Sequence, residues 1–78
     1  MEVLTLLTAF EVEKLTENFF EAKALHFEGC FPVKEGNETV MRIYVWGPQG
    51  RFLMKMTQDK KLFSHSKDRQ HWIPIKKY

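Results

Sequence analysis

The sequence predicts an α+β fold in which one amphipathic helix packs on an antiparallel β-meander of three to five strands. Two observations support this prediction. Apolar residues recur every three or four positions over residues 9–26 and every second position over residues 39–57. The four glycines and three prolines fall where turns or sheet edges are expected. With 78 residues, of which 44% are hydrophobic and 28% charged, the chain is expected to form one domain over residues 1–78.

The helix is expected to begin after Thr8, because Thr8 and Glu11 have the spacing of a capping box. Its predicted buried stripe joins residues three and four apart: Val12, Leu15, Phe19, Ala22 and His26. The acidic outer side carries Glu11, Glu13, Glu17 and Glu21. Periodicity leaves open the burial of three further apolar residues: Phe10, Phe20 and Leu25. It also leaves open whether residues 3–7 form a short strand or extend the helix.

The next segments are predicted to be strands. Residues 27–33 form the first, with Phe27, Phe31 and Val33 on one face and Pro32 at an edge or bulge. After a turn at residues 34–37, the segments 39–46 and 51–57 alternate clearly. A hairpin closed at residues 47–50 pairs their apolar faces, which places six side chains in the core: Met41, Ile43, Val45, Phe52, Met54 and Met56.

The last third of the chain is expected to extend the meander. A turn at residues 58–61 returns a strand over residues 62–66, which places Phe63 beside Met56 on the inner face. Residues 72–75 add a last strand, in which Pro74 belongs at an edge because it cannot donate to a ladder.

Charge divides the chain into two halves. Residues 1–39 hold three lysines and eight glutamates, whereas residues 40–78 hold nine lysines and arginines and two aspartates. This asymmetry is typical of a basic contact face for nucleic acid or an acidic protein, and equally of two solvated faces. The amino terminus has neither the basic start of an export signal nor a long apolar stretch, and the single cysteine forms no internal disulfide. We therefore expect a cytoplasmic protein without a membrane segment.

The candidate binding site lies on the hairpin face opposite the core. The predicted register gathers six residues there: Arg42, Tyr44, Trp46, Arg51, Leu53 and Lys55. Aromatic residues and arginine are enriched at protein interfaces, and the same types hold single-stranded nucleic acid. We expect a non-enzymatic binding or regulatory module that engages a partner protein, such as a host-directed inhibitor or adaptor from a phage. Single-stranded RNA or DNA binding is the alternative, and a homodimer through this face or a purely structural face stays open.

No motif predicts catalysis or a cofactor. The chain has no glycine-rich phosphate loop and no serine nucleophile motif. A zinc site would draw on four side chains that lack the usual paired spacing: His26, Cys30, His65 and His71. A ribonuclease-like role would use another cluster, whose proximity in sequence does not establish acid–base geometry: His65, Lys67, Arg69 and His71. We therefore expect no enzymatic activity and no metal, and an inert buried thiol at Cys30.

Overall fold

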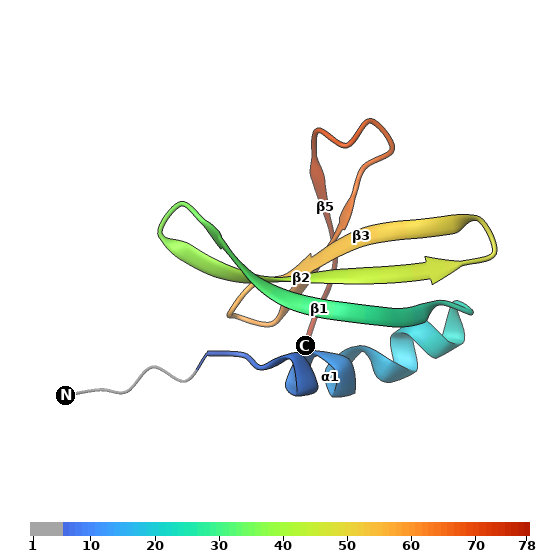
Figure 1. Cartoon of the computed structure of the whole chain (residues 1–78), viewed down its shortest axis with the longest axis horizontal. Helices are drawn as coiled ribbons and strands as arrows, with labels where there is room; N and C mark the ends of the chain where they lie inside the picture. The colour runs from blue at the N-terminus through green and yellow to red at the C-terminus, as the bar shows by residue number, and fades with distance from the viewer. Residues whose placement is uncertain (1–5) are drawn as a thin grey trace.

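A computed structural model describes residues 6–78, which form one helix and five strands. The helix α1 (Ala9–Ala22) is followed by β1 (His26–Glu35), β2 (Glu38–Gly47), β3 (Gly50–Met56), β4 (Lys61–His65) and β5 (Trp72–Lys77). All neighbouring strands pair antiparallel, in the order β1-β2-β3-β4-β5. Figure 1 shows α1 beneath the sheet next to β1, and the β4–β5 hairpin turning away from the other strands. The predicted α+β fold is confirmed.

The beginning of α1 is as predicted, and its end is not. Glu11 N–H donates to the Thr8 hydroxyl at 3.1 Å, and Thr8 N–H donates to the Glu11 carboxylate at 3.3 Å. The helix ends at Ala22, because Ala24 takes a left-handed conformation (φ 56°) and Leu25 N–H donates to the Phe20 carbonyl at 2.8 Å. The chain thereby reverses into β1. The placement of His26 on the helix was wrong: it is the first residue of β1.

The buried face of α1 is rotated relative to the predicted stripe. It is centred on Val12, Thr16 and Phe20, whereas Ala22 is exposed. Thr16 is tolerated in apolar surroundings because its hydroxyl donates to the Val12 carbonyl at 2.8 Å, which satisfies the buried polar group. Of the side chains that periodicity left undecided, Phe20 is buried, and Phe10 is 68% exposed.

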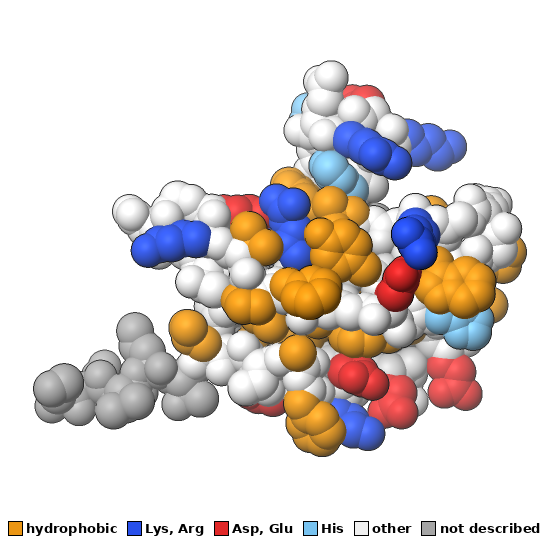
Figure 2. All heavy atoms as spheres, in the orientation of Figure 1, with side chains coloured by type: hydrophobic (Ala, Val, Ile, Leu, Met, Phe, Trp, Pro, Cys, Tyr) orange, Lys and Arg blue, Asp and Glu red, His pale blue; other side chains and the backbone are white. Residues whose placement is uncertain are grey.

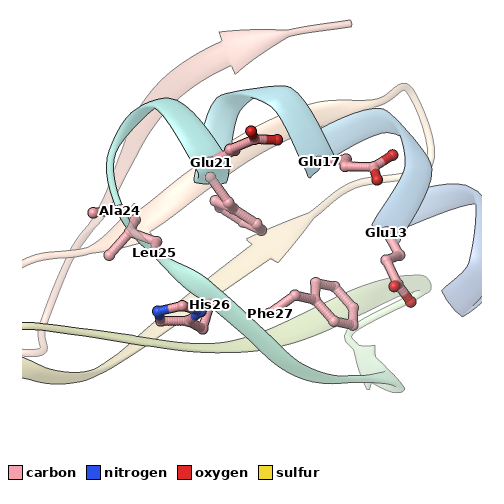
Figure 3. Close-up of a pocket in the computed structure, with 8 residues that line it drawn as sticks. Glu13, Glu17, Glu21, Ala24, Leu25, His26 and Phe27 are labelled. Carbon is pink, nitrogen blue, oxygen red and sulfur yellow. The ribbon is translucent and has the colours of Figure 1, made fainter.

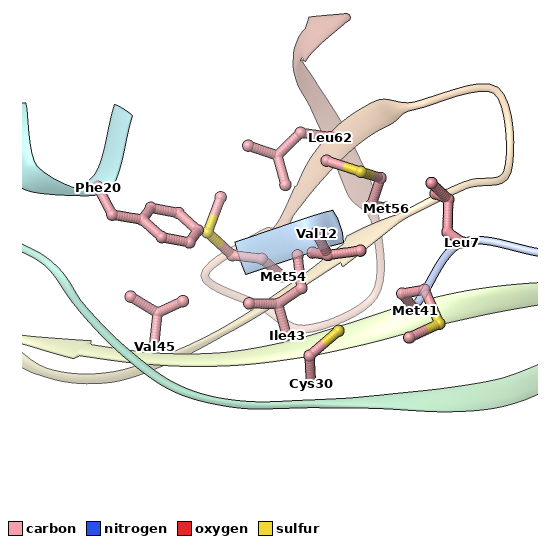
Figure 4. Packing of buried hydrophobic residues seen from close by; sticks show 10 residues of the cluster. All are labelled: Leu7, Val12, Phe20, Cys30, Met41, Ile43, Val45, Met54, Met56 and Leu62. Atoms are coloured by element: carbon pink, nitrogen blue, oxygen red, sulfur yellow. The ribbon is translucent and has the colours of Figure 1, made fainter. Parts of the chain in front are cut away.

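The register of the β2–β3 hairpin is confirmed. Met41 pairs with Met56, Ile43 with Met54 and Val45 with Phe52. Five of these six side chains are buried, and Phe52, at the end of the hairpin, is 38% exposed. Figure 4 shows the core between the sheet and α1, formed by Leu7, Val12, Phe20, Cys30, Met41, Ile43, Val45, Met54, Met56 and Leu62. Burying each large aliphatic side chain stabilises the fold by about 1.5–3 kcal/mol.

Two predictions of side-chain direction were wrong, each by one position. The pairing of β1 with β2 shifts between Phe27 and Gly29, so Phe27 packs against the core while Phe31 lies on the opposite face. In β4 the pairs are Met56 with Leu62 and Lys55 with Phe63. Leu62 is therefore the buried residue and Phe63 faces the other way. A bulge or a turn displaced by one residue moves every following side chain to the other face of the sheet.

Leu7 and Tyr78, near the two ends of the described chain, pack against the core. Of residues 3–7, for which the sequence left strand and helix open, residues 3–5 lie outside the part that the structure describes. Leu6 and Leu7 belong to neither helix nor strand, and Leu7 N–H donates to the Gln58 side chain at 2.8 Å. Pro74 lies in β5, an edge strand as predicted.

Within residues 6–78, no helix has the length and apolarity needed to cross a membrane.

Candidate binding face

The sheet surface opposite α1, here called the outer face, carries the six predicted site residues. Cross-strand pairs bring them together: Arg42 with Lys55, Tyr44 with Leu53, and Trp46 with Arg51. Because α1 lies on the other side, Tyr44 and Trp46 remain 43% and 48% exposed. Figure 2 shows hydrophobic side chains gathered over the middle of the visible face, with lysine and arginine side chains between and above them. The predicted geometry is confirmed, and its role in binding stays a prediction.

Strand β1 adds aromatic side chains that the sequence did not assign to this face. Phe31 is 57% exposed, and its ring packs edge-on against Tyr44 with the centroids 5.8 Å apart. His26 lies against Trp46 at 4.9 Å between ring centroids. The three large rings of Phe31, Tyr44 and Trp46 are called the aromatic ridge below. Phe31 was missed because the bulge in β1 reverses its direction. The sequence signal for that bulge is Gly29, an isolated glycine within the predicted strand.

Two of the predicted cations share one carboxylate within the fold. Both bind Glu35, the last residue of β1: Arg42 Nη2 lies 3.1 Å from one carboxylate oxygen and Lys55 Nζ lies 2.8 Å from the other. The Lys55 side chain is only 11% exposed, and its ammonium lies 4.5 Å from the ring centroid of Trp72. The hydrogen bond from Lys55 is the main cause that lowers the pKa of Glu35 below its usual value.

The third predicted cation, Arg51, remains accessible. Its side chain is 81% exposed, although Nη2 lies 3.2 Å from the Glu28 carboxylate. Such an exposed ion pair is worth less than about 1 kcal/mol and exchanges readily with other partners. Arg51 is therefore available to a ligand, whereas Arg42 and Lys55 are less exposed and already paired with Glu35.

A groove of about 610 Å³ runs between the outer face of the β2–β3 hairpin and the loop that joins β4 to β5. We call it the basic groove, because its lining includes three cations beside apolar and aromatic side chains: Tyr44, Arg51, Leu53, His65, Lys67 and Arg69. The loop at residues 66–71 carries two of these cations. Its contribution was not predicted, since the sequence gives no position for this loop relative to β2.

The carboxylates of α1 lie elsewhere. Glu13, Glu17 and Glu21 line a separate cleft of about 320 Å³ between α1 and the start of β1. Figure 3 shows them on successive turns of the helix, on the side next to His26 and Phe27. The acidic helix therefore neither covers the aromatic ridge nor lines the basic groove, and the two charged sides of the molecule are separated.

The described residues give no support to a metal centre or a reactive thiol. Within residues 6–78, no three His, Cys, Asp or Glu side chains are grouped so as to hold a metal ion. His26 lies against Trp46, and His65 stacks on Trp72 at 4.3 Å. Burial raises the pKa of the Cys30 thiol to about 11, which keeps it protonated at neutral pH and makes it a poor nucleophile.

Comparison with known proteins found no matching family model, no matching curated protein and no matching solved structure. The outer face itself is therefore the basis for inferring a function.

Proposed function

We propose that this protein is a non-enzymatic binding module that engages a partner protein through the aromatic ridge. The observation that carries the proposal is the ridge itself: Phe31 and Tyr44 are in ring contact, Trp46 lies two residues further along β2, and each is 43–57% exposed on the sheet face opposite α1. Contiguous exposed apolar surface typically marks an interaction site. Aromatic side chains held by neighbours lose little conformational entropy on binding, which is one reason they often dominate interface energetics.

Charge supports a protein partner over a single nucleic-acid strand. A protein that binds a single strand tracks its backbone with cations and stacks bases on aromatic rings. Here Glu35 already binds Arg42 and Lys55. Two cations of the outer face are therefore already ion-paired, which leaves fewer of them free to follow a phosphate backbone. An aromatic centre with a mixed polar rim is typical of a protein interface.

An inhibitory or adaptor role belongs to the same proposal. An inhibitor or adaptor acts by occupying a surface, which a small sheet with one exposed aromatic face is able to do. Cys30 is a free thiol within the core, which fits a reducing compartment such as the cytoplasm.

Affinity capture from a lysate of the source cells tests the proposal. The double variant Phe31→Ala/Trp46→Ala removes two rings of the ridge, and we expect it to weaken capture of a protein partner by at least about 30-fold. Phe10→Ala is the matched control, because Phe10 is 68% exposed but lies on α1. Circular dichroism establishes that both variants fold.

Nuclease treatment of the lysate separates the two classes of partner. Capture that survives nuclease and is lost only in the double variant supports the proposal. Capture abolished by nuclease would favour the nucleic-acid alternative, and a double variant that captures as well as the wild type would remove the ridge from consideration.

A further inference from the structure

We propose that the basic groove receives an acidic segment of the partner protein, in which carboxylates alternate with apolar side chains. The inference rests on the proposed function, since it names the chemistry of the same partner. Tyr44 belongs to both the aromatic ridge and the lining of the groove, so a partner seated on the ridge extends naturally into the groove.

The lining of the groove combines two kinds of surface. Leu53 and the ring of Tyr44 supply apolar contact from β3 and β2. Arg51 lies on the same hairpin, and Lys67 and Arg69 lie on the facing loop. A ligand that satisfies both kinds of surface needs apolar groups and negative charge, which an acidic amphipathic peptide provides.

The nearest acidic side chains already have partners. Glu28 lies 3.2 Å from Arg51. Asp68, between Lys67 and Arg69 in sequence, accepts a hydrogen bond from Gln70 N–H at 3.0 Å and lies 3.6 Å from His71 Nδ1. No acidic side chain is among the residues that line the described groove. The groove therefore favours an anionic ligand, although its excess of positive charge is small.

The loop that carries the cations is held in place before any ligand binds. Ser66 N–H donates to the His71 carbonyl and Arg69 N–H to the Ser66 carbonyl, both at 2.9 Å. At the base of the loop, His65 stacks on Trp72 with the rings nearly parallel at 10°. The Lys55 ammonium of β3 in turn lies over the Trp72 ring, so the β4–β5 hairpin contacts the outer face. Such preorganisation lowers the entropy cost of binding.

The same features disfavour a nucleic-acid strand as the occupant. One face of the His65 ring is already taken by Trp72, which leaves fewer surfaces for stacked bases. Leu53 offers apolar contact rather than hydrogen bonds to phosphate or sugar. Three cations, one of them beside Glu28, suit a few carboxylates better than a continuous run of phosphates.

The test measures direct binding of a fluorescently labelled dodecapeptide in which Glu and Leu alternate. Fluorescence anisotropy compares it with the same peptide carrying Gln in place of Glu, and with a dodecamer of thymidine. We expect the Glu peptide to bind, and the Gln peptide to bind at least about tenfold more weakly. Lys67→Glu/Arg69→Glu should weaken binding of the Glu peptide by at least the same factor. The matched control Lys76→Glu/Lys77→Glu, on exposed positions of β5, should change it less than about twofold.

Each other outcome overturns the inference. Absence of peptide binding, or binding unaffected by reversal of the loop charges, excludes the groove as an acidic-segment site. Tighter binding of the thymidine strand, lost in the Lys67→Glu/Arg69→Glu variant, assigns the groove to nucleic acid. Self-association of the wild type that the same variant abolishes assigns it to a second copy. The failures are distinguishable, since partner capture lost only in the Phe31→Ala/Trp46→Ala variant leaves the proposed function intact even where the peptide does not bind.

Discussion

Glu35 decides what two of the outer-face cations are able to do. Its carboxylate joins β1 to Arg42 on β2 and to Lys55 on β3, at 3.1 and 2.8 Å. From the sequence, Arg42 and Lys55 were expected to contact a ligand. In the structure both are paired with the Glu35 carboxylate, and both lie over the Trp72 ring. A residue's charge therefore indicates a binding role only after its neighbours are known.

Glu35→Gln should lower the free energy of unfolding by about 1–2 kcal/mol, because it leaves the largely buried Lys55 ammonium without its counterion. Urea unfolding at neutral pH measures the difference. Glu38→Gln is the matched control, since Glu38 lies at the other side of the same turn and is exposed. Equal stability of the two variants would show that the Glu35 ion pairs contribute nothing beyond surface charge.

The same carboxylate makes stability depend on pH. The pKa of Glu35 is lower in the folded protein than in the unfolded chain, so the folded state favours the ionised form. Its contribution is complete above the unfolded pKa of about 4.3 and disappears as the pH falls through the lower folded pKa. The stability difference between wild type and Glu35→Gln should therefore shrink progressively below about pH 4, as a series of urea titrations would measure. A difference that stays constant across that range contradicts this assignment.

At the scale of elements, the β2–β3 hairpin depends on the conformation of its turn. Gly47 pairs with Gly50, and Gly50 has a φ of 116°, which side chains other than glycine rarely adopt. A methyl group on Gly50 would meet nothing within 4 Å, so substitution there costs backbone strain and no clash. Gly50→Ala should therefore destabilise the protein by about 1–3 kcal/mol in urea unfolding. The neighbouring Gln49→Ala should have little effect, and an equally small effect of both changes would rule out strain at this turn.

The elements that local sequence determines were predictable. The hydrogen bonds that begin α1 join residues three positions apart, and the β2–β3 register follows from a short turn and two alternating segments. Errors arose at the helix end, at a bulge and at a turn, where a change of one residue alters every following side-chain direction. The helix ends where Leu25 N–H donates to the Phe20 carbonyl, the bulge at Phe27 reverses Phe31, and the turn before β4 buries Leu62 in place of Phe63.

The candidate site was predictable to the same extent. Alternation along two strands is enough to place Tyr44, Trp46 and Arg51 on one face. Neither the added ring of Phe31 nor the ion pairs of Glu35 follow from that alternation, because both depend on how β1 pairs with β2. The basic groove depends on the position of the β4–β5 loop, which no local rule supplies.

At the scale of the whole molecule, the described sheet is open and has two edges, β1 and β5. An uncovered edge offers backbone N–H and C=O groups to other chains and promotes aggregation. Each edge strand here contains a proline, Pro32 in β1 and Pro74 in β5, and each pairs with its neighbour through an irregular register. Both features shorten the run of regular edge that another strand is able to pair with.

Pro32→Thr/Pro74→Thr should therefore increase self-association, because it restores an N–H donor to both edges at once. One restored edge supports pairing of two molecules, whereas two restored edges allow extended assemblies. Sedimentation velocity over a range of concentrations should give a larger mean mass for the double variant than for either single variant or the wild type. Pro48→Thr, in the turn between β2 and β3, controls for loss of a proline away from an edge. A double variant whose mass matches the wild type at every concentration would mean that the twist and bulges of the sheet protect its edges without the prolines.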